Sequence, residues 1–372
     1  GGALRSRAAT SPGRVGGEVR GGCLPPRASR APRRFSETEK GRAVRLLRLA
    51  GQTRRGYSQH MRIIRDFQFV EQQDRGASVA IGNFDGVHRG HQFVIDIARR
   101  EATAFSAPLG VMTFEPHPRE YFAPGGDPFR LMNAEARANR LDWLGVEKLY
   151  ELTFNDTLSA LTPEDFARRV IVDGLGLRHV VVGADFHFGA KRAGNVDTLV
   201  ALGREMGFGV TVAPLMHDDD VEISSTAIRQ ALSEGRPRDA ARMLGHWHRI
   251  DGTVVRGDQR GRDLGYPTIN MSIAGLHPPR FGVYAVKADV LTGPHAGEYG
   301  GAASIGVRPT FGENLPNIET FLFDFKGDLY GEHISVALVD YLRPEERFDS
   351  LDALIEQMDD DCAKARAVLA AT

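Results

Sequence analysis

Apolar runs of strand length alternate with stretches of helical spacing from residue 78 to about residue 235. In the helical stretches, apolar residues recur three and four positions apart, whereas the runs between them are short and nearly continuous. Strands that alternate with helices predict a parallel sheet covered by helices on both faces. We expect strands at 78–81, 109–114, 148–152, 179–182 and 209–213, and helices at 92–104, 134–144, 163–172 and 198–206.

The pattern changes near Gly245. Beyond it, strand-like runs separated by turns predict an antiparallel barrel. The expected strands cover 248–255, 283–290, 301–307, 318–325 and 334–342. Residues 350–370 then form an amphipathic helix, whose apolar face should hold Leu351, Leu354, Ile355 and Met358. We therefore expect one domain at 61–245 and a second at 246–372.

The first sixty residues show neither helical nor strand periodicity. They contain thirteen Arg and one Lys against three Glu. Such a stretch resembles a transit peptide or a basic arm that binds nucleic acid. A third interpretation is that translation begins at Met61 and that the upstream residues are not part of the native protein. We favour the third, treat residues 1–60 as a disordered basic extension, and expect a chain that begins at Met61 to be fully active.

The composition of the 372 residues, 42% hydrophobic and 26% charged, is typical of a soluble protein with two cores. Beyond residue 60 there are 33 basic against 45 acidic residues, a net charge of −12, which disfavours general nucleic-acid binding. Cys23 and Cys362 are too few for a cysteine zinc site or a disulfide framework. No apolar run reaches the roughly 18–20 residues of a membrane span. We therefore expect a cytoplasmic enzyme without membrane or nucleic-acid partners, and the oligomeric state stays open.

The first candidate site lies at residues 82–91, where Gly-Asn-Phe-Asp-Gly-Val-His-Arg-Gly-His joins the first expected strand to the first helix. His88 and His91 fall on one side of the first helical turn, and Gly90 between them permits close approach by a ligand. The N–H groups at the helix start and the imidazole donors suit a phosphate on which negative charge develops. A histidine pair can also bind a metal or simply be surface polarity. The strand-to-helix junction and its three glycines favour the phosphate interpretation.

A second phosphate pattern follows the last expected strand of the parallel sheet. Ser224, Ser225 and Thr226 are favourable N-cap residues with hydroxyls that can reach a phosphate, and Arg229 lies one turn further. Ordinary capping also explains these residues. Their place after the sheet favours a triphosphate site, because ligands of open α/β sheets bind at the carboxyl ends of the strands. We interpret the acidic residues 218–220 as a solvated loop rather than a metal site.

The third candidate site is residues 257–270, Gly-Asp-Gln-Arg-Gly-Arg-Asp-Leu-Gly-Tyr-Pro-Thr-Ile-Asn, after the first strand of the second half. A glycine-rich loop can bind phosphates through its backbone N–H groups. The spacing matches neither the P-loop nor the kinase glycine-rich loop. Thr268 and Asn270 supply a hydroxyl and an amide oxygen, both ligand types that suit Mg²⁺.

Residues 82–91 resemble the His-x-Gly-His signature of the α/β nucleotidyltransferases, in the form found in the adenylyltransferase half of bacterial FAD synthetases. Residues 113–118, 183–189 and 223–229 are similar to further segments of that half. The resemblance implies a Rossmann-like domain in which His88 and His91 are catalytic. It implies substrate and nucleotide binding by Gly82, Phe84, Asp85, Gly86, Gly90, Asp185, Ser224, Ser225, Thr226 and Arg229.

Residues 257–270 resemble the riboflavin kinase signature, and residues 282–286, 305–311, 319–325, 328–331 and 342–344 fit later segments in order. The resemblance implies a six-stranded antiparallel β-barrel with a C-terminal helix. In it Glu319 is the base for the riboflavin 5′-hydroxyl, and Thr268 and Asn270 hold Mg-ATP. It further implies nucleotide binding by Gly257, Gly261, Gly265, Pro267 and Arg343. Ile269 stands where the family usually has Ala, and Ser304 where it often has Asn. Because Ile269 sits between the two metal-binding residues, we expect it to crowd the loop.

The resemblance covers about residues 61–370 and implies a bifunctional enzyme that phosphorylates riboflavin to FMN and adenylylates FMN to FAD. ATP and Mg²⁺ serve both steps, and the flavins are substrates and products. One rival is a transferase that makes a pyridine or lipid nucleotide and uses the barrel only for binding; Thr268, Asn270 and Glu319 argue against it. The other is a flavin sensor without turnover, which the retained phosphate-binding residues disfavour. Channelling of FMN and the preferred metal stay open.

Overall fold

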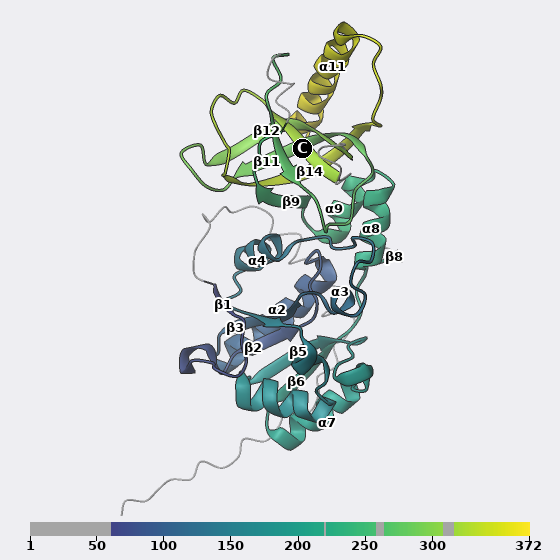
Figure 1. Ribbon diagram of the computed structural model, residues 1–372. Helices are drawn as coiled ribbons and strands as arrows, with labels where there is room; N and C mark the ends of the chain where they lie inside the picture. Colours follow the sequence, from purple (N-terminus) through teal and green to yellow (C-terminus); the bar gives the residue numbers. More distant parts are fainter. Residues whose placement is uncertain (1–60, 219–220, 258–263, 308–315) are drawn as a thin grey trace, which may run out of the picture.

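The protein is described by a computed structural model over residues 61–218, 221–257, 264–307 and 316–372. The predicted extension at residues 1–60 lies outside this described part, as do Gly261 of the glycine-rich loop and Asp219 and Asp220 of the acidic run. Figure 1 shows a sheet with helices in the lower half and a curled sheet in the upper half, with α8 and α9 between them.

The first sheet has six strands in the order β1-β4-β3-β2-β5-β6, and every pairing in it is parallel. The strands are β1 (Arg62–Ile64), β2 (Ser78–Ile81), β3 (Leu109–Glu115), β4 (Lys148–Thr153), β5 (His179–Gly183) and β6 (Gly209–Ala213). From β2 the chain proceeds through β3 to β4 on one side, and then through β5 to β6 on the other. The reversal places a crevice beside the carboxyl end of β2, where ligands of such sheets bind.

Helices cover both faces of this sheet and bury one hydrophobic cluster on each. Alternate residues of β2 enter opposite clusters: Val79 and Ile81 pack into one and Ala80 into the other. The helices are α2 (Arg89–Phe105), α3 (Pro118–Phe122), α4 (Ala134–Trp143), α5 (Asp156–Ser159), α6 (Pro163–Asp165), the π-helix η2 (Phe166–Gly174), α7 (Val196–Met206), α8 (Ser225–Ser233) and α9 (Pro237–Leu244). Single 3-10 turns form η1 (Gln72–Asp74) and η3 (Ala190–Arg192), and a short hairpin pairs β7 (His217–Asp218) with β8 (Val221–Glu222).

The parallel α/β architecture predicted from the sequence is confirmed, with strands 78–81 and 209–213 at their expected bounds. The helix expected at 163–172 differs, because its α-helical part ends at Asp165 and a π-helix continues to Gly174. The Leu175 N–H bonds to the Val170 carbonyl at 2.8 Å, five residues back. Hydrophobic spacing could not predict this, because Phe166, Val170 and Ile171 face the core in either geometry.

The second sheet has six antiparallel strands in the order β10-β13-β12-β11-β14-β9 and curls into a half-barrel. The strands are β9 (His248–Thr253), β10 (Thr268–Ser272), β11 (Gly282–Val290), β12 (Gly297–Val307), β13 (Pro316–Leu322) and β14 (His333–Arg343). An isolated bridge between Val255 and Asn270 joins the two ends of the sheet. Residues such as Val286, Ile305 and Ile318 fill its interior.

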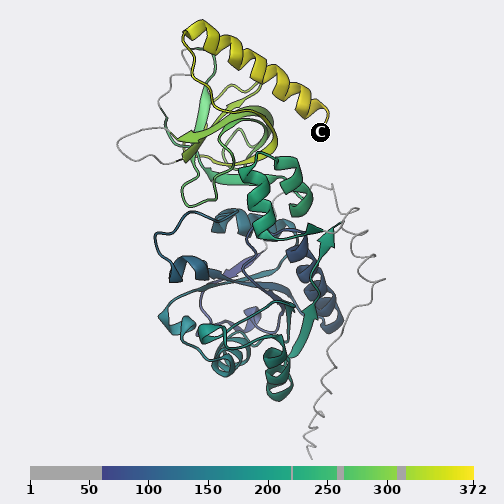
Figure 2. The same ribbon diagram turned by 90° about the vertical axis from the view of Figure 1, so that its right-hand side faces the viewer.

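The C-terminal helix α11 (Leu351–Ala370) begins one residue after the expected start, because Ser350 is its N-cap and the Ser350 hydroxyl accepts from the Ala353 N–H. Its predicted apolar face is wrong in part, because Leu351 is 55% exposed. The buried positions lie further along, at Asp361 and Ala365. Figure 2 shows why: α11 runs along the outside of the barrel and extends beyond it. Amphipathic spacing predicted a helix but not the part of it that contacts the sheet.

Polar contacts join the two halves. The Asn133 amide donates to the Asp251 carbonyl at 3.0 Å, and Glu135 contacts His333 at 2.8 Å. Every hydrophobic cluster found among the described residues lies wholly before Gly245 or wholly after it. The halves therefore have separate hydrophobic interiors and a polar junction.

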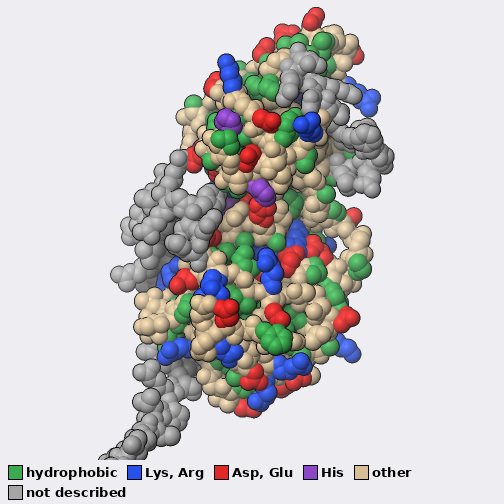
Figure 3. All heavy atoms as spheres, turned by 60° about the vertical axis from the view of Figure 1, so that its left-hand side comes forward, with side chains coloured by type: hydrophobic (Ala, Val, Ile, Leu, Met, Phe, Trp, Pro, Cys, Tyr) green, Lys and Arg blue, Asp and Glu red, His purple; other side chains and the backbone are tan. Residues whose placement is uncertain are grey.

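On the face drawn in Figure 3, Lys and Arg side chains are interspersed with Asp and Glu over the parallel-sheet half. Within the described ranges, no helix combines the length and the apolar character needed to cross a membrane.

Candidate active sites

The loops after β2 and β5 lie next to each other at the carboxyl edge of the parallel sheet, because these two strands pair directly. Gly82 follows β2, and β5 ends at Gly183. Asp185 is exposed just beyond β5. A Cβ on Gly183 would lie 2.9 Å from the Asp185 carboxylate, so the glycine makes room for that side chain. Two loops in which the sequence predicted site residues are thus brought together at the crevice.

His88 and His91 stack at the start of α2. Their ring centroids lie 3.6 Å apart with an interplanar angle of 17°. His88 is the N-cap residue, and its Nδ1 accepts from the His91 N–H at 3.3 Å. A Cβ on Gly90 would lie 3.1 Å from the His88 ring. The space beside Gly90 is therefore taken by the His88 imidazole. The sequence interpretation had expected a ligand in that space.

Both imidazoles are held in their neutral form at pH 7. Burial, and then the charge of Arg229, lowers the pKa of His88 to about 4. Burial and the neighbouring His88 lower the pKa of His91 well below its usual value. The buried His91 Nδ1 has no hydrogen-bond partner among the described residues. Buried polar atoms are normally paired, so this nitrogen is an exception.

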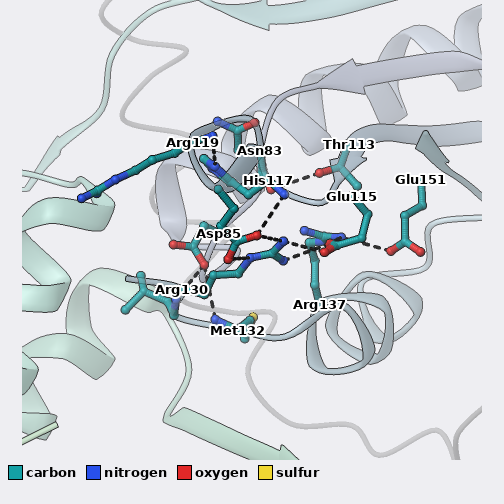
Figure 4. Close-up of polar contacts among 12 residues, drawn as sticks. Asn83, Asp85, Thr113, Glu115, His117, Arg119, Arg130, Met132, Arg137 and Glu151 are labelled. Carbon is teal, nitrogen blue, oxygen red and sulfur yellow. Dashed lines mark hydrogen bonds and ion pairs between the residues drawn. The ribbon is translucent and has the colours of Figure 1, made fainter. Parts of the chain in front are cut away.

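Asp85 joins three segments around the histidine pair. Its carboxylate accepts from the Leu131 N–H at 2.8 Å and from the Met132 N–H at 3.3 Å, and Figure 4 shows it beside this turn. Its other oxygen accepts from Arg229 Nη2 at 2.6 Å. Burial raises the pKa of Asp85, and the charge of Arg229 and the two backbone donors only partly oppose this rise. The side chain expected to contact a substrate is thus turned toward the protein.

Of the residues around the start of α8, some bond to the protein and others are exposed. Ser224 caps the helix by accepting from the Ala227 N–H, and the Ser225 hydroxyl donates to the Asp85 carbonyl at 3.0 Å. Thr226 is exposed. Arg229 Nε donates to the Phe129 carbonyl at 2.6 Å. Within the described residues Arg229 bonds through Nε and Nη2, which leaves Nη1 for a phosphate oxygen.

A charged network that the sequence interpretation missed lies beside this site (Figure 4). Glu115, the last residue of β3, accepts from both Nη atoms of Arg130 and from Arg137 at 2.8 Å. Arg130 also bonds Glu120, and Arg137 reaches Glu151 at 3.0 Å. Arg137 is only 2% exposed. The signal for Glu115 was its place at the carboxyl end of a strand, the same argument that selected Ser224.

This network fixes the charges at the crevice. Burial acts to raise the pKa of Glu115, but hydrogen bonds from Arg130 and Arg137 bring it below its usual value. Burial, followed by the charge of Arg130, lowers the pKa of His117 to about 4. His117 caps α3 and lies edge-on to Phe129 at 5.0 Å between ring centroids. His117 is therefore a neutral donor or acceptor at neutral pH.

An aromatic cluster stands at the ends of β3 and β4. Phe154 makes edge contacts with Phe114, Tyr121 and Phe122 at centroid distances of 5.2 to 5.8 Å. Phe122 is 68% exposed, an unusual state for a phenyl ring. An exposed ring in such a cluster offers a face on which a planar aromatic ligand can stack.

In the half-barrel, three predicted or noted positions form one row across adjacent strands. Asn270 of β10 lies opposite Glu319 of β13, and Glu319 lies opposite Ser304 of β12. The Asn317 amide donates to the Asn270 side-chain oxygen at 3.5 Å and to the Glu319 carboxylate at 3.3 Å. Asn317 was not predicted. Its signal was its place two residues before Glu319, because alternate residues of a strand lie on one face.

Thr268 and Asn270 lie on one face of β10, and Ile269 lies on the other. Ile269 packs against the interior cluster that also contains Met271. The expected crowding by Ile269 is therefore wrong, because residues 268–272 form a strand and alternate residues point to opposite faces. The sequence interpretation had placed these residues in a loop.

The other predicted nucleotide contacts are scattered. A Cβ on Gly257 would lie 2.5 Å from the Asn270 amide, so the backbone of the glycine-rich segment lies directly against that side chain. Gly265 has a φ of +86°, which favours glycine. It precedes Tyr266, whose hydroxyl donates to Asp359, and Pro267, which leads into β10. Arg343 bonds the buried Asp361 of α11 at 2.7 Å, so its guanidinium contacts the C-terminal helix.

The donor set fits a Mg²⁺ ion that arrives with ATP. Mg²⁺ usually takes one or two protein oxygens and completes its shell with waters and substrate phosphates. The Thr268 hydroxyl and the Asn270 amide oxygen are such ligands, on one face of β10 beside a glycine backbone. Among the residues that the structure describes, no group of three or more His, Cys, Asp or Glu side chains could hold a metal.

Comparisons with known proteins match the two halves to two families. The FAD synthetase family matches residues 70–227, and the riboflavin kinase family matches residues 244–369. The bifunctional riboflavin kinase/FMN adenylyltransferase of Pseudomonas fluorescens is 40% identical over 83% of this chain and 98% of its own length. The protein of the same name from Bacillus subtilis is 36% identical over 80% of this chain and 93% of its length.

A solved structure gives the same architecture. The crystal structure titled a macrolide-efflux protein from Streptococcus pneumoniae superposes with a TM-score of 0.70 at 32% identity. It covers 81% of this chain and 97% of the other. The similarity thus spans both halves.

Proposed function

The chain belongs to the family of bifunctional riboflavin kinase/FMN adenylyltransferases, and we propose how its residues divide the two reactions between its halves. The half-barrel of residues 246–372 phosphorylates riboflavin to FMN. The parallel-sheet domain of residues 61–245 transfers AMP from ATP to FMN and releases pyrophosphate. The separate hydrophobic interiors on either side of Gly245 support this division.

In the kinase half, the Glu319 carboxylate takes the proton of the riboflavin 5′-hydroxyl as that oxygen attacks the γ-phosphorus of ATP. The bond from the γ-phosphorus to the leaving oxygen breaks, and ADP departs. The Asn317 amide holds the carboxylate at 3.3 Å. The backbone at Gly257 lies against Asn270, where its N–H groups can bind the phosphates of ATP. Catalysis rests on positioning and charge stabilisation, as is usual for phosphoryl transfer.

Thr268 and Asn270 would hold the Mg²⁺ that accompanies ATP. When bound, this ion neutralises charge on the phosphates of ATP. The side-chain oxygen of Asn270 is held at one edge of the half-barrel, because Asn270 pairs with Glu319 and accepts from the Asn317 amide.

In the adenylyltransferase half, an oxygen of the FMN phosphate attacks the α-phosphorus of ATP, and the bond to the β-phosphate breaks. No protein nucleophile or base is needed, because the FMN phosphate is already ionised. The neutral His88 and His91 donate N–H bonds to phosphate oxygens as charge develops. Arg229 Nη1 and the exposed Thr226 hydroxyl add donors at the start of α8. Asp85 keeps Arg229 in place at 2.6 Å.

The isoalloxazine ring of FMN stacks on the aromatic cluster around Phe122. That ring is planar and aromatic, and the 68% exposure of Phe122 supports a surface that a ligand covers. Because both reactions consume ATP, we expect the enzyme to act in the cytoplasm on riboflavin, FMN and ATP, without nucleic-acid partners.

One observation carries the proposal: the stacked, neutral histidine pair lies at the crevice of one half, and the Asn270–Glu319 pair lies in the other. The test is chromatography of flavins after the purified protein is incubated with riboflavin, ATP and Mg²⁺. FMN should appear first and FAD afterwards. Accumulation of FMN alone would remove the adenylyltransferase assignment, and unchanged riboflavin would remove the kinase assignment.

A further inference from the structure

A segment of the half-barrel reaches across to the adenylyltransferase site. Residues 276–280 follow β10 and precede β11. Leu276 forms a parallel bridge with Arg130, and the His277 N–H donates to the Arg130 carbonyl at 2.8 Å. The Arg280 N–H donates to the carbonyl of Leu232 in α8 at 2.9 Å. The segment is thus bonded at both ends to the other half.

The side chain of His277 contacts α8 itself. Its Nε2 lies 3.0 Å from the Arg229 carbonyl oxygen and 2.9 Å from the Ser233 hydroxyl. Arg229 is the residue whose guanidinium bonds Asp85 and the Phe129 carbonyl. One histidine of the half-barrel therefore contacts α8 at Arg229 and, through its backbone, the 129–131 turn that Arg229 also bonds.

The segment is suited to hold a fixed position. Pro278 and Pro279 follow His277 directly, and each fixes its own φ near −65°. Leu276 is 7% exposed and belongs to the interior cluster of the half-barrel. Because this segment is restricted in its conformation, its contact with α8 fixes α8 relative to the half-barrel.

We propose that His277 is a positioning residue for FMN adenylylation, which it supports by fixing α8 so that Arg229 presents Nη1 to the phosphates of ATP. This inference rests on the proposed function of the parallel-sheet half. It gives the half-barrel a part in the second reaction that is separate from its own catalysis. His277 acts through Arg229 and contacts no reacting atom.

The experiment compares His277→Ala with the unchanged full-length protein. The kcat of FAD formation from FMN and ATP should fall about ten-fold, the size expected when one orienting hydrogen bond is lost. Riboflavin phosphorylation and the melting temperature should be unchanged. His277→Gln, whose amide nitrogen can reach the same carbonyl, should restore most of the rate. His333→Ala is the matched control, because it removes another contact between the halves, that with Glu135, and should leave FAD formation normal.

A double-mutant cycle with Arg229→Lys separates positioning from general loosening. If His277 acts through Arg229, His277→Ala should cost little further activity in the Arg229→Lys background. Equal and additive losses, or a normal rate of FAD formation in His277→Ala, would overturn the inference. If the unchanged protein makes no FAD, the proposed function itself fails, so the two failures are distinguishable. Should His277→Ala not fold, a normal rate in a folded His277→Leu variant would equally overturn it.

Discussion

Asn270 and Glu319 lie directly opposite each other on β10 and β13, and the amide of Asn317 donates to both side chains, at 3.5 and 3.3 Å. Asn270 and Glu319 are 49 positions apart in the sequence, and Asn317, which belongs to none of the motifs, bonds to both of them. In an antiparallel pair, residues directly opposite share a face and lie close together. The register of two strands therefore brings together the residues of the proposed kinase site.

The first prediction concerns Asn317. Asn317→Ala should lower the kcat of riboflavin phosphorylation about ten-fold, because one hydrogen bond that orients the base is lost. Adenylylation of FMN should be unaffected, since Asn317 belongs to the half-barrel. Steady-state kinetics of both reactions on one preparation measures this. A normal kinase rate would show that the Asn317 amide does not orient Glu319.

The second prediction concerns the Asp85–Arg229 pair, whose side chains are 7% and 18% exposed. Asp85→Asn should lower the unfolding free energy of the parallel-sheet half by about 3–5 kcal/mol, because it leaves Arg229 without its buried partner. FAD formation should fall with it. Urea unfolding followed by circular dichroism gives the stability. Glu234→Gln breaks the exposed pair with Arg236 and should leave the unfolding curve unchanged; if both variants behave alike, the burial of Asp85 has no energetic role.

The third prediction is a loss of stability in mild acid. Burial lowers the pKa of His88, His117, His179 and His248 from 6.5 to about 4. Below pH 6.5 the unfolded chain therefore binds protons at these sites that the folded chain does not, so the unfolding free energy falls as the pH drops from 6.5 toward 4. His179→Gln should give a shallower dependence over this range, because one such site is removed. A pH-independent unfolding midpoint between 6.5 and 4.5 would contradict the buried, neutral state of these imidazoles.

The fourth prediction is that a fragment of residues 246–372 folds and converts riboflavin to FMN without making FAD. The interior of the half-barrel uses no residue before Gly245. His88 and His91 are absent from the fragment. Flavin chromatography after incubation with riboflavin and Mg-ATP measures both products. A folded fragment without kinase activity would show that the halves depend on each other for the first reaction.

The sequence predicted five of the six strands of the parallel sheet, because a buried strand such as residues 78–81 is marked by its composition alone. The edge strand β1, which has three residues, was not predicted. Nor did the sequence predict β10. Residues 268–272 contain only two apolar side chains, and the surrounding glycines and proline are typical of a loop. Their strand geometry comes from pairing with β13, about fifty residues later, which is information that no local pattern carries.

The candidate site was predicted in part for a related reason. His88 and His91 lie three residues apart in the chain, so the motif sufficed to find them. Arg137 is buried among carboxylates from β3 and β4, and its role depends on three segments that meet only in the fold. Asp85 and Arg229 were found by motif, but their mutual contact at 2.6 Å was not, because each was assigned to a ligand separately.

The central claim is that one chain carries two reactions at two separate sites, and a crossed comparison of two variants tests it most directly. Glu319→Gln should lose riboflavin phosphorylation and keep FMN adenylylation, because only the hydroxyl of riboflavin needs a base. His88→Ala or His91→Ala should each lower FAD formation about a hundred- to thousand-fold, the scale of one lost donor to developing charge, and the double variant should lose at least as much and keep the kinase reaction. Both rates are measured beside a melting curve. Loss of both reactions in either well-folded variant, or near-normal FAD formation in the double variant, would contradict the account.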